Sequence, residues 1–184
     1  MTQKQSIDQA PGSGVRETCP AGDFRTAMQK LAGSVCVVTS AHEGKRLGLT
    51  MTAVCSLSAD PPSLVACVNR SAEAHDMIIA SGRLCVNVLK YHHVPLSVSF
   101  SAGDGSKGEV RFTTADWGVG VTGSPVLADA LAYFDCWVVE YMQAKTHTVF
   151  MCNVASAGTS QSGTALIYAN RQYGRLAADE ESKK

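Results

Sequence analysis

Short runs of β-branched and apolar residues, each ended by a turn signal, constrain the fold of this 184-residue chain most. The most informative run covers 46–58 and stops at Asp60-Pro61-Pro62, where the prolines cannot continue a hydrogen-bonded ladder. Similar runs predict further strands at 35–40, 64–69, 83–89, 130–142, 146–155 and 165–168. Strands at this hairpin-like spacing, with only short helices between them, predict a mainly β fold, a largely antiparallel barrel decorated by helices.

The ends of the chain differ in composition from its middle. Residues 1–22 are rich in Gln, Ser, Gly and Pro and are expected to form a flexible N-terminal arm, while 177–184 form a charged C-terminal tail. Residues 23–176 are expected to form one domain, whose first helix begins at the capping residue Asp23. Ser71 is expected to cap a second helix that stops at Gly82. A third helix is expected over 93–101, and a loop over 102–124.

Charge and cysteine usage exclude several classes of protein. Sixteen basic and sixteen acidic residues cancel, and only 17% of residues are charged, below the roughly 25% of a typical soluble domain. Nucleic-acid and anionic-membrane binders need a basic excess, so neither partner is expected. A surface short of charge instead suggests that a partner subunit covers part of it. Seven cysteines without a C-x-x-C motif, and an N-terminus without a secretory signal, predict reduced thiols in a cytoplasmic protein.

One face of the strand predicted at 46–58 is lined by hydroxyl groups and holds no charge. Because side chains alternate along a strand, Thr50, Thr52, Ser56 and Ser58 share this face with Gly48. Such a face suits an uncharged polar ligand with many hydrogen-bonding groups. The competing interpretation is a solvated strand that uses Thr for its β-propensity.

A second candidate site is the segment Asn69-Arg70-Ser71, which precedes the second predicted helix. Free N–H groups at a helix N-terminus favour an anion such as phosphate, although an ordinary helix cap is the simpler explanation. Ser99, Ser101, Lys107 and Arg111 flank a glycine-containing loop and would add donors and positive charge to the same anion.

Other chemical motifs give weak or negative signals. Gly118–Gly123 satisfies G-x-G-x-x-G, but Pro125 follows where a dinucleotide-binding unit needs a helix, so that fold is excluded. No histidine and cysteine have zinc-ligand spacing, and no metal is expected. His147 opens a predicted strand and suits a site at its edge, although a lone histidine is more often structural. Asp135, among large apolar residues, is expected to face outward or to be satisfied at a dimer interface.

The order of these motifs resembles that of the short-chain flavin reductase family over roughly residues 23–176. The resemblance rests on Gly48–Ser58 followed by Asp60-Pro61-Pro62, on Asn69-Arg70-Ser71 with His75, on Gly82–Leu89, on Phe100-Ser101 with Lys107, on His147–Phe150, and on Tyr173–Leu176. It implies an antiparallel, Greek-key-like, FMN-binding split β-barrel and a homodimer. It also implies a flavin reductase component of a two-component monooxygenase, of the kind that acts on phenols, chlorophenols or 4-hydroxyphenylacetate.

The implied activity is that of an NAD(P)H:flavin oxidoreductase. Hydride would pass from NADH to exchangeable FAD or FMN, and the reduced flavin would diffuse to a partner monooxygenase of aromatic-compound degradation. Hydride transfer needs a stacked, desolvated encounter rather than a strong acid or base, which agrees with the lack of catalytic triads in the sequence. The alternative is a non-catalytic split-barrel protein that stores or senses flavin. A heme-binding barrel is disfavoured by the hydroxyl-rich face.

The resemblance also implies the site residues. His147 matches the family histidine near the nicotinamide and is the expected catalytic residue. NADH is expected to contact His147, Asn170, Arg171, Gln172 and Tyr173. The expected flavin-binding residues are Arg46, Leu47, Gly48, Leu49, Thr50, Thr52, Ala53, Ser56, Cys67, Val68, Asn69, Glu73, Ala74, His75, Ser99, Phe100 and Lys107. The chain departs from the family pattern at Cys152, at Asn153 and at 170–172.

Overall fold

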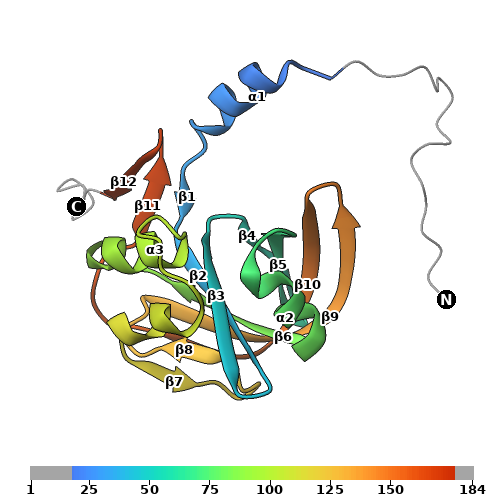
Figure 1. The fold of residues 1–184 in the computed structure, drawn as a ribbon, viewed down its shortest axis with the longest axis vertical. Coiled ribbons are helices and arrows are strands. Elements are labelled where there is room, and N and C mark those ends of the chain that lie inside the picture. Colours follow the sequence, from blue (N-terminus) through green and yellow to red (C-terminus); the bar gives the residue numbers. More distant parts are fainter. Residues whose placement is uncertain (1–17, 177–184) are drawn as a thin grey trace, which may run out of the picture.

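A computed structural model describes residues 18–176, so most of the predicted arm and all of the predicted tail lie outside the described residues. The described chain forms three antiparallel sheets and three α-helices (Figure 1). The largest sheet contains β2 (Cys36–His42), β3 (Lys45–Met51), β4 (Val54–Ala59), β5 (Pro62–Asn69), β6 (Arg83–Val88), β9 (Ala132–Ala144) and β10 (His147–Thr159). The outer sheet contains β1 (Gly33–Ser34), β11 (Leu166–Ala169) and β12 (Gln172–Arg175). A ribbon pairs β7 (Trp117–Val119) with β8 (Pro125–Leu127).

The seven-stranded sheet is curled into a split barrel. Its strand order is β3-β2-β6-β9-β10-β5-β4. The two edge strands, β3 and β4, are consecutive in sequence and are separated only by Thr52 and Ala53. Because three residue steps span at most about 11 Å, the sheet must curl until its edges approach each other at this connection. The antiparallel β-barrel predicted from the sequence is confirmed.

Two hydrophobic clusters lie on opposite faces of β2 and β6. Val38 and Phe150 belong to the inner cluster, which α2 (Glu73–Ser81) covers with Ile78. Val37 and Phe100 belong to the outer cluster, which α3 (Val94–Phe100) and two short 3-10 helices, η2 (Tyr91–His93) and η3 (Gly108–Thr114), cover. Burial on both faces explains why β2 begins with three consecutive apolar residues, Cys36-Val37-Val38, rather than alternating apolar and polar ones.

The strand predicted at 46–58 is broken in the middle. Thr52 and Ala53 leave the ladder, Val54 N–H donates to the Thr52 carbonyl (3.0 Å), and Cys67 N–H donates to the Ala53 carbonyl (3.0 Å). The chain therefore changes from one edge of the barrel to the other within the predicted strand. The prediction of a single strand over 46–58 was wrong.

Helix α1 (Ala21–Met28) begins before the predicted start. Asp23 lies in its first turn and not at its cap. None of its residues is buried, and Figure 1 shows it apart from the barrel, above the outer sheet. Its apolar residues Phe24 and Met28 are therefore about half exposed, at 55% and 47%.

Helix α2 begins two residues after its predicted cap. Ala72 precedes its first residue, and Ser71 instead donates its N–H and its hydroxyl to Asn69 Oδ1 (3.0 Å each). Gly82 ends α2 in the left-handed conformation, as predicted. The expected loop over 102–124 contains η3 and β7, and β12 is a strand that the sequence did not predict.

The seven cysteines are all free. Four are buried, as predicted, whereas Cys19 and Cys55 are exposed and Cys67 is half-buried. Burial raises the pKa of Cys36 and of Cys152 to about 12, and burial followed by the neighbouring Cys55 raises the pKa of Cys67. The buried thiols are therefore protonated at neutral pH and do not act as nucleophiles.

Candidate functional site

Gly48 on β3 is fixed by a close approach of α3. A Cβ at this position would lie 2.8 Å from a ring carbon of Phe100 and 3.0 Å from the Val38 carbonyl oxygen. The Phe100 ring packs edge-on against Phe112, with 5.1 Å between ring centroids, and also contacts Trp117. The side of β3 at Gly48 is therefore filled by aromatic packing, and the glycine itself is buried.

The hydroxyl groups predicted to share one face are divided by the strand break. The Thr50 hydroxyl donates to the Ser97 carbonyl of α3 (2.7 Å). Thr52, Ser56 and Ser58 lie beyond or at the break and are exposed. The predicted common face was wrong, because alternation does not continue through Thr52 and Ala53.

A large hollow of about 1110 Å³ opens beside this break. It is mostly apolar and lies between α1, β1, β4 and the β11–β12 turn; among the residues that line it are Phe24, Met28, Thr52, Ser56, Ser58 and Arg171. Two arginines, Arg25 of α1 and Arg171, contribute positive charge to its lining. A hollow with apolar walls, a few hydroxyls and cationic groups suits a planar ligand that carries phosphate.

The N-terminal end of α2 lies beside the start of β10. Asn69 and His147 are directly opposite each other in the β5–β10 pairing, and Arg70 N–H donates to the Thr146 carbonyl (3.0 Å). The His147 ring is exposed, and its Nδ1 lies 2.9 Å from the Thr146 hydroxyl. The structure thus brings the predicted catalytic histidine next to a predicted flavin-binding residue.

His147 and the hollow are separate places in the described residues. His147 does not line the hollow, whereas Ala53 lines it and binds Cys67 through its carbonyl. Cys67, Val68 and Asn69 then lead along β5 to His147. The predicted flavin residues therefore form a path from the hollow to the start of α2, rather than a single pocket.

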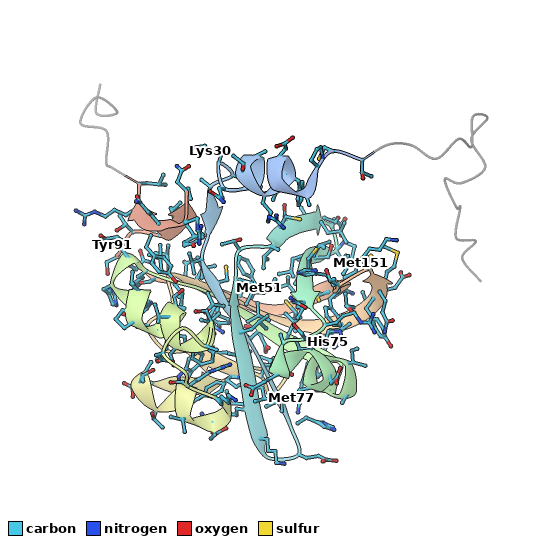
Figure 2. All side chains as sticks on the ribbon, turned by 45° about the horizontal axis from the view of Figure 1, so that its top comes forward. Lys30, Met51, His75, Met77, Tyr91 and Met151 are labelled. Atoms are coloured by element: carbon cyan, nitrogen blue, oxygen red, sulfur yellow. The ribbon has the colours of Figure 1, made fainter. Side chains whose placement is uncertain are left out.

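Helix α2 turns Ala74 and His75, two of the predicted flavin-binding residues, toward the core. Ala74 and His75 are buried. The His75 ring is bonded at Nδ1 to Asp76 Oδ1 (2.7 Å) and at Nε2 to the Thr148 hydroxyl (2.8 Å), so it joins α2 to β10 (Figure 2). Both ring nitrogens are occupied within the chain, and the side chains of Ala74 and His75 face the core.

The charge of Arg111 in η3 is engaged by backbone carbonyls and by Glu73 of α2. Arg111 is buried, and its guanidinium donates to the Ser106 carbonyl (3.0 and 2.7 Å) and to the Gly48 carbonyl (3.3 Å). Glu73 accepts from Gly108 N–H (3.4 Å) and lies 3.4 Å from Arg111. Arg111 therefore braces the loop instead of serving a free anion.

Other predicted residues near this loop differ in what they offer a ligand. Arg46 pairs with Glu109 and lies over the Phe112 ring, so its charge is partly engaged. Leu47 and Leu49 pack against the inner cluster. Lys107 is exposed. Ser99 Oγ is buried without a hydrogen-bond partner among residues 18–176, which fits a site that gains a polar ligand there.

The β11–β12 hairpin carries the residues assigned to NADH. Asn170 and Arg171 form its two-residue turn with φ of 51° and 62°, the left-handed values that such turns require. Asn170 N–H donates to the Gln29 carbonyl beyond α1 (2.6 Å). Tyr173 is half-buried, and its hydroxyl lies 2.9 Å from Ser97 Oγ. Of these residues, Arg171 faces the hollow and Tyr173 faces α3.

Asp135 is buried within the chain, which contradicts both predictions made for it. Its carboxylate accepts the N–H of Thr122 (2.7 Å) and the Thr122 hydroxyl. A Cβ at Gly120 would overlap this carboxylate. The glycine-rich motif over 118–123 is therefore a loop wrapped around a buried acid.

A cluster that the sequence search missed joins η2 to the loop before β9. Asp129 pairs with the Lys90 ammonium and lies 3.0 Å from His92 Nε2 and 3.6 Å from His93 Nε2. His93 Nδ1 accepts the Lys90 N–H (3.2 Å). A neutral imidazole has one nitrogen that can accept a hydrogen bond, and in His93 this nitrogen is Nδ1. The Nε2 atom of His93 therefore carries the hydrogen and does not coordinate a cation. The cluster is a structural ion-pair network.

Among residues 18–176, no helix is both long enough and apolar enough to span a bilayer.

Comparisons with known proteins identify the chain's relatives. A family model described as a flavin reductase like domain matches residues 28–177. The chain is 42% identical to an FMN reductase (NADH), RutF, of Agrobacterium fabrum, over 82% of this chain and 86% of that protein. It is 38% identical to the reductase component of 4-hydroxyphenylacetate 3-monooxygenase of Pseudomonas aeruginosa, over 83% and 90%. The solved flavin reductase PheA2 is 28% identical, with a TM-score of 0.79 over 87% of this chain and all of that one.

Proposed function

Because this chain belongs to the flavin reductase-like domain family and is an NADH-dependent flavin oxidoreductase, we propose that it passes the reduced flavin to a separate monooxygenase. Its cofactors are a flavin, FMN or FAD, and NADH. The observation that carries the proposed flavin site is the broken strand. It places Thr52 and Ala53 between the hollow and the β5 segment that ends beside His147.

The proposed flavin site follows this path. Thr52, Ser56 and the backbone around Ala53 would bind the uncharged part of the flavin, and Lys107 with Ser99 would meet its phosphate. The support is the exposed hydroxyls in the hollow and the buried, unpartnered Ser99 hydroxyl. Hydroxyls and backbone groups give moderate affinity, which suits a cofactor that must leave. When bound, the flavin would accept the hydride from NADH.

His147 is proposed to orient the nicotinamide. The exposed ring at the start of β10 has one nitrogen near the Thr146 hydroxyl, which leaves Nε2 available for a ligand. A positioned ring beside a flavin helps to exclude water and to hold the two reacting rings together, and both effects accelerate hydride transfer. Arg171 is proposed to meet the phosphates of NADH from the hairpin.

A homodimer is proposed as the working form. Apolar side chains of α1 (Phe24 and Met28), of the segment after it (Leu31) and of β9 (Trp137 and Val139) are exposed at 44–67%. Exposed apolar groups of this size favour burial against another subunit. The low charge of the chain agrees with a covered surface. Multi-angle light scattering should give twice the 19.4 kDa chain mass, and a monomer mass would contradict the dimer.

The partner is proposed to be a monooxygenase of aromatic-compound degradation in the cytoplasm. Support for the partner is the relative in Pseudomonas aeruginosa, which is named as the reductase component of 4-hydroxyphenylacetate 3-monooxygenase. Support for the location is that all seven cysteines are free.

Anaerobic reduction tests the activity most directly. Purified protein is mixed with NADH and either FMN or FAD, and the flavin and nicotinamide absorbance bands are followed together. Both should fall in step and faster than in a protein-free control. Flavin that binds without bleaching would instead indicate a storage or sensing protein. Repeating the assay with NADPH defines the donor, and adding an aromatic monooxygenase with its substrate tests delivery of the reduced flavin.

A further inference from the structure

The outer sheet is joined to the barrel unevenly. Its β11 is held by backbone bonds, since Leu166 N–H donates to the Leu89 carbonyl (2.9 Å) and Lys90 forms a bridge with Ala165. The edge strand β12 pairs only with β11 in the sheet. It reaches the rest of the molecule through side chains, such as Arg175 over the Tyr91 ring (5.1 Å; Tyr91 is labelled in Figure 2).

Tyr173 is the residue of β12 that packs against the outer cluster of the barrel. Its hydroxyl lies 2.9 Å from Ser97 Oγ, and Ser97 is fully buried on the inner side of α3. The Tyr173 ring also packs edge-to-face against Tyr168 of the same hairpin, with 5.2 Å between ring centroids. A hydrogen bond in such a site resists competition from water and holds the strand at one distance from α3.

The same Ser97 also contacts the flavin-side strand. Its carbonyl accepts the Thr50 hydroxyl (2.7 Å), one residue from the strand's end at Met51 (labelled in Figure 2). One residue of α3 therefore touches β3 through its backbone and β12 through its side chain. No other residue in the described part of the chain hydrogen-bonds through its side chain to Tyr173.

We infer that Ser97 is a positioning residue, which acts through Tyr173 to hold the Asn170–Arg171 turn at a set distance from the flavin strand. This inference rests on the proposed roles of β3 and the hairpin in binding flavin and NADH. The turn has two non-glycine residues in left-handed conformations, which an unrestrained turn would leave more often. Loss of the Tyr173–Ser97 bond should release the turn and weaken NADH binding without altering the flavin strand.

The test uses a matched pair of tyrosines on one hairpin. Tyr173→Phe removes the hydroxyl that meets Ser97, while Tyr168→Phe removes a hydroxyl that has no hydrogen-bond partner within residues 18–176. Both variants keep the edge-to-face contact between the two rings. Tyr173→Phe should accelerate amide hydrogen exchange in 172–175 about fivefold and raise the KM for NADH about fivefold. It should leave the flavin Kd and the kcat unchanged. Tyr168→Phe, whose ring lines the hollow, serves as the control for amide exchange and should leave the exchange in 172–175 unchanged.

Ser97→Ala and the double variant Ser97→Ala/Tyr173→Phe complete the cycle. Ser97→Ala should match Tyr173→Phe, and the double variant should be no worse than either single one, because both remove the same bond. Additive effects would overturn the inference, as would an equal effect of Tyr168→Phe on amide exchange, or faster exchange with an unchanged KM for NADH. Hydrogen exchange is measured on the protein without cofactors, so its result is independent of whether the proposed function holds.

Discussion

The two sides of the proposed site are built in different ways. On the flavin side, β3 is covered by α3, whose residues Ser97 and Phe100 are buried, and Gly48 is enclosed by aromatic packing. On the nicotinamide side, the turn of the β11–β12 hairpin is exposed, and the neighbouring α1, which lines the hollow together with Thr52 and Ser56, buries none of its residues. One cofactor would therefore bind to a rigid, preformed surface, and the other to a thin, lightly anchored one. Segments with few buried contacts open at low cost, which suits a reactant that exchanges in each turnover.

The largest expected difference comes from adding one methyl group on each side. Gly48→Ala forces a Cβ against Phe100 and the Val38 carbonyl, so we expect a loss of about 2 kcal/mol in the free energy of unfolding and weaker flavin binding. Gly174→Ala in β12 meets nothing within 4 Å and should change stability by less than about 0.5 kcal/mol. Denaturant unfolding of both variants measures this. Equal losses would show that the two sides are equally packed.

His147 tests whether the nicotinamide side extends to the start of β10. We expect His147→Ala to lower kcat/KM for NADH about tenfold while changing the flavin Kd less than twofold, because the ring lies past the flavin residues of β5. The control is His42→Ala, at the β2–β3 turn, where the ring has only a long contact with Glu43 (3.8 Å). Unchanged steady-state NADH kinetics in His147→Ala would remove this residue from the site.

Thr50, just before the strand break, and Thr52, within it, should separate the effect on folding stability from the effect on flavin binding. Thr50→Val removes the bond to the Ser97 carbonyl, and we expect a loss of about 1 kcal/mol in unfolding free energy. Thr52→Val changes an exposed hydroxyl in the hollow and should weaken flavin binding about threefold with an unaltered Tm. Thermal unfolding and a flavin titration of each variant decide between these effects. If Thr50→Val rather than Thr52→Val raises the flavin Kd, the flavin binds on the α3 side of β3.

The smallest expected effect is a pH dependence at the attachment of the outer sheet. Burial, then His92 and Lys90, lower the pKa of His93 below 6.5, although Asp129 acts in the opposite direction. The unfolded chain then takes up the proton more readily. His93 therefore contributes its full stability above pH 6.5, and that contribution declines as the pH falls toward the lower folded-state pKa.

The His93 effect can be separated from that of its neighbour. Hydrogen bonding from Lys90 lowers the pKa of Asp129 below 3.8, so its own loss of stability occurs in more acid solution. His93→Asn keeps an acceptor for the Lys90 N–H but does not titrate. The Tm of this variant should vary less with pH between 5 and 7 than that of the unaltered protein. If the Tm of the variant and that of the unaltered protein change equally with pH, His93 is not the source of the pH dependence.

The sequence predicted the barrel but not its closure. Hairpin spacing, the end of α2 at Gly82 and the third helix follow from local turn and capping chemistry, and all are confirmed. The sequence did not predict the break at Thr52 and Ala53, because neither residue is Gly or Pro. The alternation of apolar and polar residue types in the sequence also continues past them, although the alternation of side-chain directions in the structure does not. What breaks the strand there is the pairing of β4 with β5 on the far edge, a long-range constraint.

The site residues show the same limit. Asn69 was predicted to bind the flavin and His147 to be the catalytic residue, but only the register of β5 and β10 shows that they are neighbours. The partner of Asp135 was unpredictable because it comes from a loop thirteen residues earlier in the chain, at Thr122. Tyr173 was expected to contact NADH. The hydrogen bond of its hydroxyl to Ser97 joins residues 76 positions apart, and the sequence did not predict it. Periodicity reports which face a residue occupies and not which distant segment covers it.

The pairing of β1 with β11 also has a consequence for the order of folding. Gly33 and Ser34 are matched with Tyr168 and Ile167, so this sheet joins the two ends of the described chain. Such a closure has a high entropic cost and depends on residues that leave the ribosome last. The β2–β3 hairpin has all its residues early in synthesis, whereas the outer sheet forms only when the chain is nearly complete. A nascent or C-terminally shortened chain would thus acquire the flavin-side strand well before it could acquire the surface for the nicotinamide.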